Sequence, residues 1–126
     1  MDFLGLRHLG RSFSNAFRGL REAFQEVAFR QELAIGAVAL PVAWLVPGLS
    51  LLWRVFLTVC WLAPPAMEIV NTAVENAVNI LSPQWNPLAR KAKDLAGAGV
   101  LCICLANLFA WGAAAWEVLG CLLKKG

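Results

Sequence analysis

Residues 55–81 read VFLTVCWLAPPAMEIVNTAVENAVNIL, an almost wholly apolar run that carries Glu68 and Glu75 two helical turns apart, with Asn71 between them. A helix of this length crosses a bilayer, because each residue rises about 1.5 Å and the hydrocarbon core is about 30 Å thick. Ionisable groups at that depth are costly and therefore point to a function. The run predicts a membrane helix with a functional polar stripe.

The composition of the whole chain is that of a membrane protein. Of 126 residues, 60% are hydrophobic and 6 are Trp, and the mean hydropathy is +0.63, well above what a soluble domain needs for its core. Two further runs free of charge flank the first one. We therefore expect an all-α membrane protein with transmembrane helices at 33–53, 55–81 and 95–119, in a single domain of residues 1–126.

The first part of the chain, residues 1–31, is too charged to cross a membrane. From Phe13 its apolar side chains recur at spacings of three and four, which predicts an amphipathic helix that lies at the membrane surface. It has no continuous apolar run, so we expect no cleaved signal peptide.

The basic residues predict the orientation of the chain. Five arginines of the first 32 residues and the trio Arg90, Lys91 and Lys93 fall on the same side if the chain crosses three times. By the positive-inside rule, the N-terminus and the loop of residues 82–94 lie in the cytoplasm. The protein is then a multi-pass membrane protein, with its C-terminus on the opposite side.

Prolines mark two interruptions. Pro64 and Pro65 lack backbone donors one turn before Glu68, which predicts a kink or an irregular turn. The run SPQWNP at 82–87 is turn chemistry, so the helix stops there and a third helix starts near Leu88. Cations in the first turns of that helix oppose its dipole, which indicates a bound polyanion.

The polar stripe suggests metal chemistry. Glu68, Asn71, Glu75 and Asn79 share one helix face. Mg²⁺ takes one or two carboxylates together with phosphate oxygens, so two glutamates near a basic rim suit a metal nucleotide. The chain has no GxxxxGK[ST] loop, and Cys102 stands where GxGxxG needs its third glycine, which excludes the usual soluble nucleotide-binding folds.

Other residues carry weaker signals. The four cysteines form no CxxC pair and His8 is the only histidine, so a disulfide or a zinc site is not expected. Small residues recur every four positions along the third span, which lets another helix approach closely. This small-residue seam consists of Asp94, Ala98, Cys102, Ala106, Ala110 and Ala114.

Three motifs, in chain order, closely resemble those of the small prokaryotic diacylglycerol kinases and of their relatives, the undecaprenol kinases. They are EVAFRQE at 26–32, MEIVNTAVENAV at 67–78 and ARKAKDLAGAGV at 89–100. The resemblance covers nearly the whole chain. It implies a homotrimeric kinase of the inner membrane that transfers the γ-phosphoryl group of Mg·ATP directly to the hydroxyl of diacylglycerol, with no nucleic acid partner.

The resemblance also implies roles for individual residues. Glu68 would be the general base, supported by Asn71, and Glu26 and Glu75 would hold Mg²⁺. The ATP-binding residues would be Glu26, Glu75, Gln84, Trp85, Asn86, Lys93 and Asp94. The residues that bind the lipid would be Ala28, Phe29, Arg30, Gln31, Glu32, Glu68 and Gly97.

Some features depart from the family pattern or leave alternatives open. Asn79 stands where family members usually have an acid, and the pair Pro64 and Pro65 is unusual. Undecaprenol could replace diacylglycerol as the alcohol. A non-enzymatic helical scaffold would explain the small-residue seam alone. A proton or ion pathway would need acids along more of the membrane depth than this chain offers.

Overall fold

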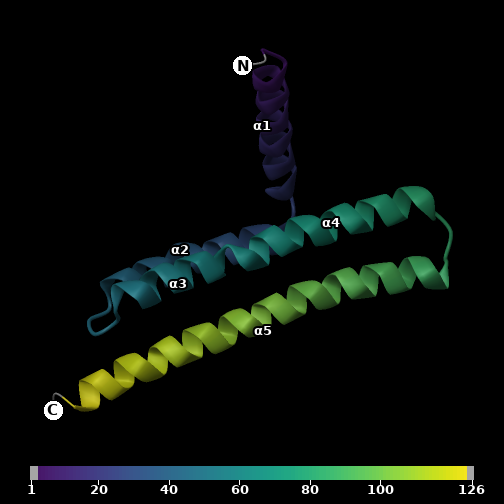
Figure 1. Ribbon diagram of the computed structural model, residues 1–126. Coiled ribbons are helices and arrows are strands. Elements are labelled where there is room, and N and C mark those ends of the chain that lie inside the picture. The colour runs from purple at the N-terminus through teal and green to yellow at the C-terminus, as the bar shows by residue number, and fades with distance from the viewer. Residues whose placement is uncertain (1–2, 125–126) are drawn as a thin grey trace.

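The computed structural model describes residues 3–124 and consists of helices joined by short turns. Figure 1 shows α2 to α5 side by side, while α1 points away from them. In chain order the helices are α1 (Phe3–Ala23), α2 (Val27–Leu45), α3 (Leu51–Trp61), α4 (Ala63–Leu81) and α5 (Pro87–Leu123).

The predicted all-α fold with three candidate membrane spans is confirmed. Three helical segments are long and apolar enough to cross a bilayer: Val27–Leu45, Leu51–Leu81 and Pro87–Leu123. The middle segment comprises α3 and α4 together. The 37 residues of α5 correspond to a length of about 55 Å, so a bilayer core of about 30 Å leaves part of this helix outside.

The turn between the first two spans differs from the predicted one. The first span was expected to reach residue 53, but α2 ends at Leu45 and α3 already begins at Leu51. Gly48 has a φ of 90°, a conformation that glycine adopts without steric cost. The Ser50 hydroxyl then caps α3 by accepting a hydrogen bond from the Trp53 N–H at 3.3 Å.

Arg54 lies within α3 and holds this turn together. Its Nε donates to the Leu49 carbonyl and its Nη2 to the Val46 carbonyl, both at 3.2 Å. The guanidinium therefore satisfies the Val46 carbonyl, which the end of α2 leaves without a helical partner, and the Leu49 carbonyl in the turn.

The other boundaries also differ from the sequence-based ones. The surface helix, expected over 1–31, ends at Ala23, and residues 27–31 form the first turns of α2. Short-range hydrogen bonds make the turn, from the Gln25 N–H to the Glu22 carbonyl at 2.9 Å and from the Glu26 N–H to the Ala23 carbonyl at 3.0 Å. The third span, expected over 95–119, is the central part of α5.

The break predicted at the prolines is confirmed. Helix α3 ends at Trp61, and Leu62 separates it from α4. Pro64 and Pro65 lie buried in the first turn of α4, where a missing N–H costs least. The regular pattern resumes with the Ala66 N–H, which donates to the Leu62 carbonyl at 3.2 Å.

Two glycines allow the helices to approach closely. A side chain at Gly99 on α5 would collide with Met67 of α4, and one at Gly36 on α2 would overlap the Trp61 indole. The Trp61 ring in turn lies edge-on to Trp111 of α5, with ring centroids 6.5 Å apart. The most extensive helix contact is that of α4 with α5.

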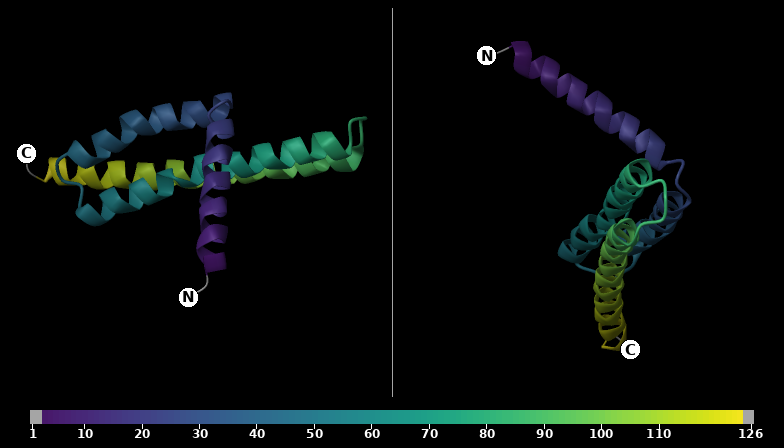
Figure 2. Two further views of the ribbon diagram at one scale, coloured as in Figure 1. Left: turned by 90° about the horizontal axis from the view of Figure 1, so that it is seen from above. Right: turned by 90° about the vertical axis from the view of Figure 1, so that its right-hand side faces the viewer.

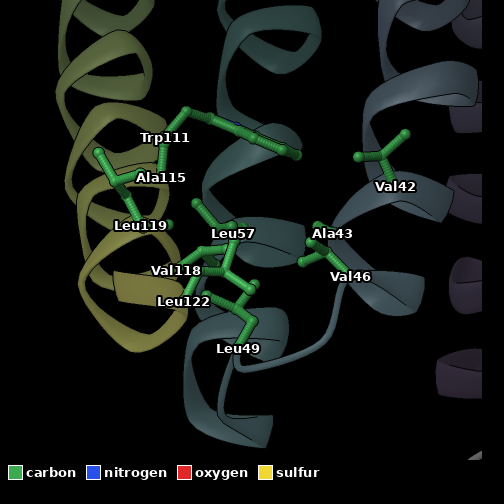
Figure 3. Close-up of a pocket in the computed structure, with 11 residues that line it drawn as sticks. Val42, Ala43, Val46, Leu49, Leu57, Trp111, Ala115, Val118, Leu119 and Leu122 are labelled. Carbon is green, nitrogen blue, oxygen red and sulfur yellow. The ribbon is translucent and has the colours of Figure 1, made fainter. Parts of the chain in front are cut away.

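The buried apolar core lies at the end of the bundle that holds the α2–α3 turn. It consists of Ala43, Leu49, Leu57 and Ala114. Leu57 is 1% exposed. Figure 3 shows these side chains converging from α2, α3 and α5 around an apolar cavity of about 360 Å³.

Helix α1 and the outer face of α5 remain largely uncovered. On α1 the side chains of Phe13 and Phe17 are exposed, and Figure 2 shows the helix crossing the direction of the bundle. Its position at a membrane surface stays a prediction. Ala98, Cys102 and Ala106 of the small-residue seam are also exposed.

We predict that Gly36→Ala destabilises the protein by about 1–3 kcal/mol, because the added methyl group overpacks the contact with Trp61. Thermal unfolding in detergent micelles measures the effect. Gly112→Ala is the matched control, since a Cβ there meets open space and alanine favours a helix over glycine by up to about 1 kcal/mol. Equal unfolding temperatures for both variants would contradict the close α2–α3 contact.

Candidate active site

A pocket of about 320 Å³ lies at the turn between α4 and α5. Gln84, Trp85, Asn86, Lys93 and Asp94 line it. These are five of the seven residues that the family resemblance implied for ATP binding. Asn79, Ser82 and Arg90 contribute further polar side chains to the lining.

The local sequence explains why the turn holds these residues. The Asn86 side chain caps α5, accepting hydrogen bonds from the Leu88 N–H at 2.8 Å and from the Ala89 N–H at 3.4 Å. Pro87 occupies the first position of the helix, where it is favoured. On the other side of the turn the Ser82 hydroxyl donates to the Gln84 carbonyl at 3.2 Å.

The charges of the pocket favour an anion. Lys93 Nζ donates to Asn79 Oδ1 at 2.6 Å across the α4–α5 interface. Since the Asn79 amide is neutral, it orients the ammonium group without neutralising it. Arg90 pairs with Asp94 at 3.6 Å, but both side chains are about 70% exposed, so this ion pair contributes little to stability. Two cations and one carboxylate thus face the pocket.

The polar stripe of α4 lies further from the turn. Glu68 is half-buried, Glu75 is exposed and Asn71 is buried. The Asn71 side chain lies beside the Glu68 carboxyl group, which also interacts electrostatically with Glu75 and Glu26. The charge of Glu68 also acts on Glu32 of α2. The start of α2 therefore brings further carboxylates to the stripe.

The carboxylates do not form a closed metal cage. Within residues 3–124 no three His, Cys, Asp or Glu side chains are close enough to hold a metal ion. Glu26 lines a separate pocket of about 300 Å³ between the end of α1 and Thr72 and Asn76 of α4. Glu75 lies on the neighbouring face of α4. One or two carboxylates are enough for Mg²⁺ when phosphate oxygens and waters complete its shell, so the donor chemistry fits.

The residues predicted to bind the lipid are spread over different environments. Phe29 is 4% exposed and packs edge-on against Phe24, with ring centroids 5.3 Å apart. Its neighbours Ala28, Arg30 and Gln31 are exposed. Gly97 is exposed on α5.

Glu32 lines a mostly apolar pocket of about 410 Å³. Pro64 of α4 and Asn107 and Trp111 of α5 share this lining. Glu32 Oε2 and Asn107 Oδ1 are buried and find no hydrogen-bond partner among the described residues. Two acceptor atoms are therefore available to a hydroxyl group in this pocket.

Two residues near the site were not singled out from the sequence for the roles they have here. Asn107 is 8% exposed, and its only sequence signal is an amide in an otherwise apolar span. Asn79 was noted for the acid it replaces, but its contact with Lys93 joins positions 14 residues apart. A contact between residues so far apart leaves no local pattern in the sequence.

Comparison with known proteins shows which family the sequence resembles. The family model for prokaryotic diacylglycerol kinase matches residues 14–115. A diacylglycerol kinase from Sinorhizobium sp is 34% identical over 103 residues, which cover 82% of this chain and 74% of that protein. The diacylglycerol kinase of Escherichia coli strain K12 is 29% identical over 118 residues, covering 92% and 95%.

A helical membrane protein with a pocket lined by Lys93 and Arg90 and with carboxylates within a candidate span has parts that suit a lipid kinase. The chain belongs to the prokaryotic diacylglycerol kinase family, and it is a lipid kinase.

We predict that Asn86→Ala frays the start of α5, because the cap contributes about 1 kcal/mol. Hydrogen exchange without nucleotide should show faster exchange of the Leu88 and Ala89 amides. Asn86→Asp retains the accepting oxygen and is the matched control. Unchanged protection in Asn86→Ala would show that the side chain does not hold this turn.

Proposed function

We propose that this protein phosphorylates diacylglycerol to phosphatidic acid, with Mg·ATP as the phosphoryl donor. The observation that carries the proposal is that a cationic pocket at the α4–α5 turn and a half-buried carboxylate, Glu68, lie on the same pair of packed helices. The relatives in Sinorhizobium sp and Escherichia coli are named diacylglycerol kinase, which supports this choice of alcohol.

The nucleotide would bind at the turn. Lys93 and Arg90 offer donors to phosphate oxygens, since a flexible ammonium and a planar guanidinium both bind phosphate. Trp85 is 79% exposed and presents an aromatic face to the adenine ring. Gln84 and Asp94 would supply hydrogen bonds to the base and the sugar.

Glu68 would act as the general base. Its carboxylate takes the proton from the lipid hydroxyl while the hydroxyl oxygen attacks the γ-phosphorus in line. The bond between the γ-phosphorus and the bridging oxygen breaks, and ADP leaves. Asn71, beside this carboxylate, would hold it in position to take the proton.

The phosphates carry charge that the protein must neutralise. Lys93 and Arg90 supply part of this positive charge, in a transfer that depends mainly on charge placement. Glu26 and Glu75 would hold Mg²⁺, which neutralises phosphate oxygens when bound. Both carboxylates are close enough to Glu68 to act on its charge, so the metal would bind near the proposed base.

The lipid would approach from the bilayer, beside α2. Glu32 Oε2 and Asn107 Oδ1 are buried acceptors without partners in the described part of the chain, and both residues line the same pocket. The hydroxyl group of a lipid alcohol would donate a hydrogen bond to one of them. The exposed residues Ala28, Arg30 and Gln31 would form the rim of this route.

We further propose that the protein works as a homotrimer in the inner membrane, with the α4–α5 turn in the cytoplasm. The exposed residues Ala98, Cys102 and Ala106 of the small-residue seam allow a helix of another copy to approach closely. In such an assembly Glu26 and Glu75 of different copies can approach one nucleotide.

A kinase assay with two lipids tests the choice of alcohol. Purified protein in mixed micelles should transfer labelled phosphate from ATP to diacylglycerol at a higher kcat/KM than to undecaprenol. Faster phosphorylation of undecaprenol would overturn the proposed substrate while leaving the enzyme class intact. Transfer to neither lipid would leave only a scaffold or an ion pathway.

Glu68→Gln tests the assigned base. We predict a loss of about 10²–10⁴-fold in kcat, the usual contribution of general base catalysis, with Mg·ATP binding unchanged. Calorimetric titration of nucleotide and the kinase assay measure the two quantities separately. Glu117→Gln makes the same chemical change at an exposed position near the other end of α5 and should retain full activity.

A further inference from the structure

The backbone break before Glu68 leaves a carbonyl group in need of a donor. In a continuous helix the Cys60 carbonyl would accept from the N–H of residue 64, but residue 64 is proline and has no N–H. The Leu62 N–H donates to the Val59 carbonyl at 3.2 Å and is shared with the Cys60 carbonyl, which therefore still lacks its regular helical donor. At membrane depth a carbonyl freed by proline is satisfied by a neighbouring helix, a side chain, an ordered water or a local 3₁₀ turn.

Asn107 of α5 supplies this donor. Its Nδ2 donates to the Cys60 carbonyl at 2.9 Å and, less closely, to the Ile103 carbonyl at 3.4 Å. The Asn107 side chain is buried, at 8% exposed. This hydrogen bond joins residues 47 positions apart and ties the end of α3 to α5.

The contact lies where it can fix the direction of α4. Helix α3 ends at Trp61, one residue after the carbonyl that Asn107 holds, and α4 begins at Ala63. Glu68 follows one turn after the prolines. Any rotation or bend at Leu62 therefore changes the depth and direction of the Glu68 carboxylate relative to α5, which carries Lys93.

We propose that Asn107 is a positioning residue that replaces the backbone donor missing at Pro64. It thereby holds the break between α3 and α4 in the geometry that sets the position of the Glu68 carboxylate. The proposal rests on the proposed role of Glu68 as general base. Asn107 and Pro64 then form a matched pair: the amide is needed because the proline is present. In this role Asn107 acts through its Nδ2 on the backbone, whereas its Oδ1 is the acceptor that faces the proposed lipid pocket.

A double-mutant cycle tests this dependence. In the native background Asn107→Ala should lower kcat by about ten- to a hundredfold, since a misplacement of about 1 Å can cost up to 10²-fold. The KM for ATP should stay unchanged, because the nucleotide pocket lies at the other end of α4. In a Pro64→Ala background the restored N–H can reach the Cys60 carbonyl, so Asn107→Ala should have little further effect.

Pro65→Ala is the matched control for the proline. Its restored N–H would face the Trp61 carbonyl, one position further along, so it should not relieve the loss caused by Asn107→Ala. Leu105→Ala removes an exposed side chain two positions before Asn107 on α5 and should leave kcat unchanged.

Each outcome of the double-mutant cycle either supports or overturns the role of Asn107. The Asn107→Ala variant could fail to fold in the native background. In that case the proposal predicts that adding Pro64→Ala restores folded protein and that adding Pro65→Ala does not. Equal losses in all backgrounds, or no loss in the native one, would overturn the proposal. An active Glu68→Gln variant would instead refute the proposed base. The structural part of the proposal would still be supported if Pro64→Ala restored the unfolding temperature that Asn107→Ala lowers.

Discussion

The packing of α4 against α5 is the interaction on which the rest of the structure depends. Close approach is possible because Gly99 leaves room for Met67. With the two helices in contact, the Asn79 amide reaches Lys93 at the turn. Beyond the break, the end of α3 meets Asn107 of the same long helix. The interface thus places the nucleotide pocket and the polar stripe on one rigid pair of helices.

Much of the fold could be predicted from the sequence, because in a bilayer the length of a charge-free run determines whether a helix can cross. The break at Pro64 followed from the missing backbone donors. The helix ends were less predictable. The first span was expected to reach residue 53 but ends at Leu45, and the Arg54 guanidinium binds the carbonyls of Val46 and Leu49, a contact that depends on the three-dimensional turn around Gly48.

The site was predictable to a smaller extent. The family resemblance implied Gln84, Trp85 and Asn86, and the structure gathers them in one pocket with the start of α5. It does not bring Glu26 into that pocket, because the turn before α2 directs this residue toward another face of α4. The role of Asn107 was hidden for a different reason: its partner is a backbone carbonyl, which has no signature in the sequence.

The central claim is that the phosphoryl group passes in one step from the nucleotide at the α4–α5 turn to a lipid hydroxyl beside Glu68. The stereochemistry at phosphorus tests it most directly. With ATP that carries an isotopically chiral γ-thiophosphate, a single in-line displacement predicts inversion of configuration in the phosphorylated diacylglycerol. Retention would require two displacements through a phosphorylated side chain and would contradict direct transfer.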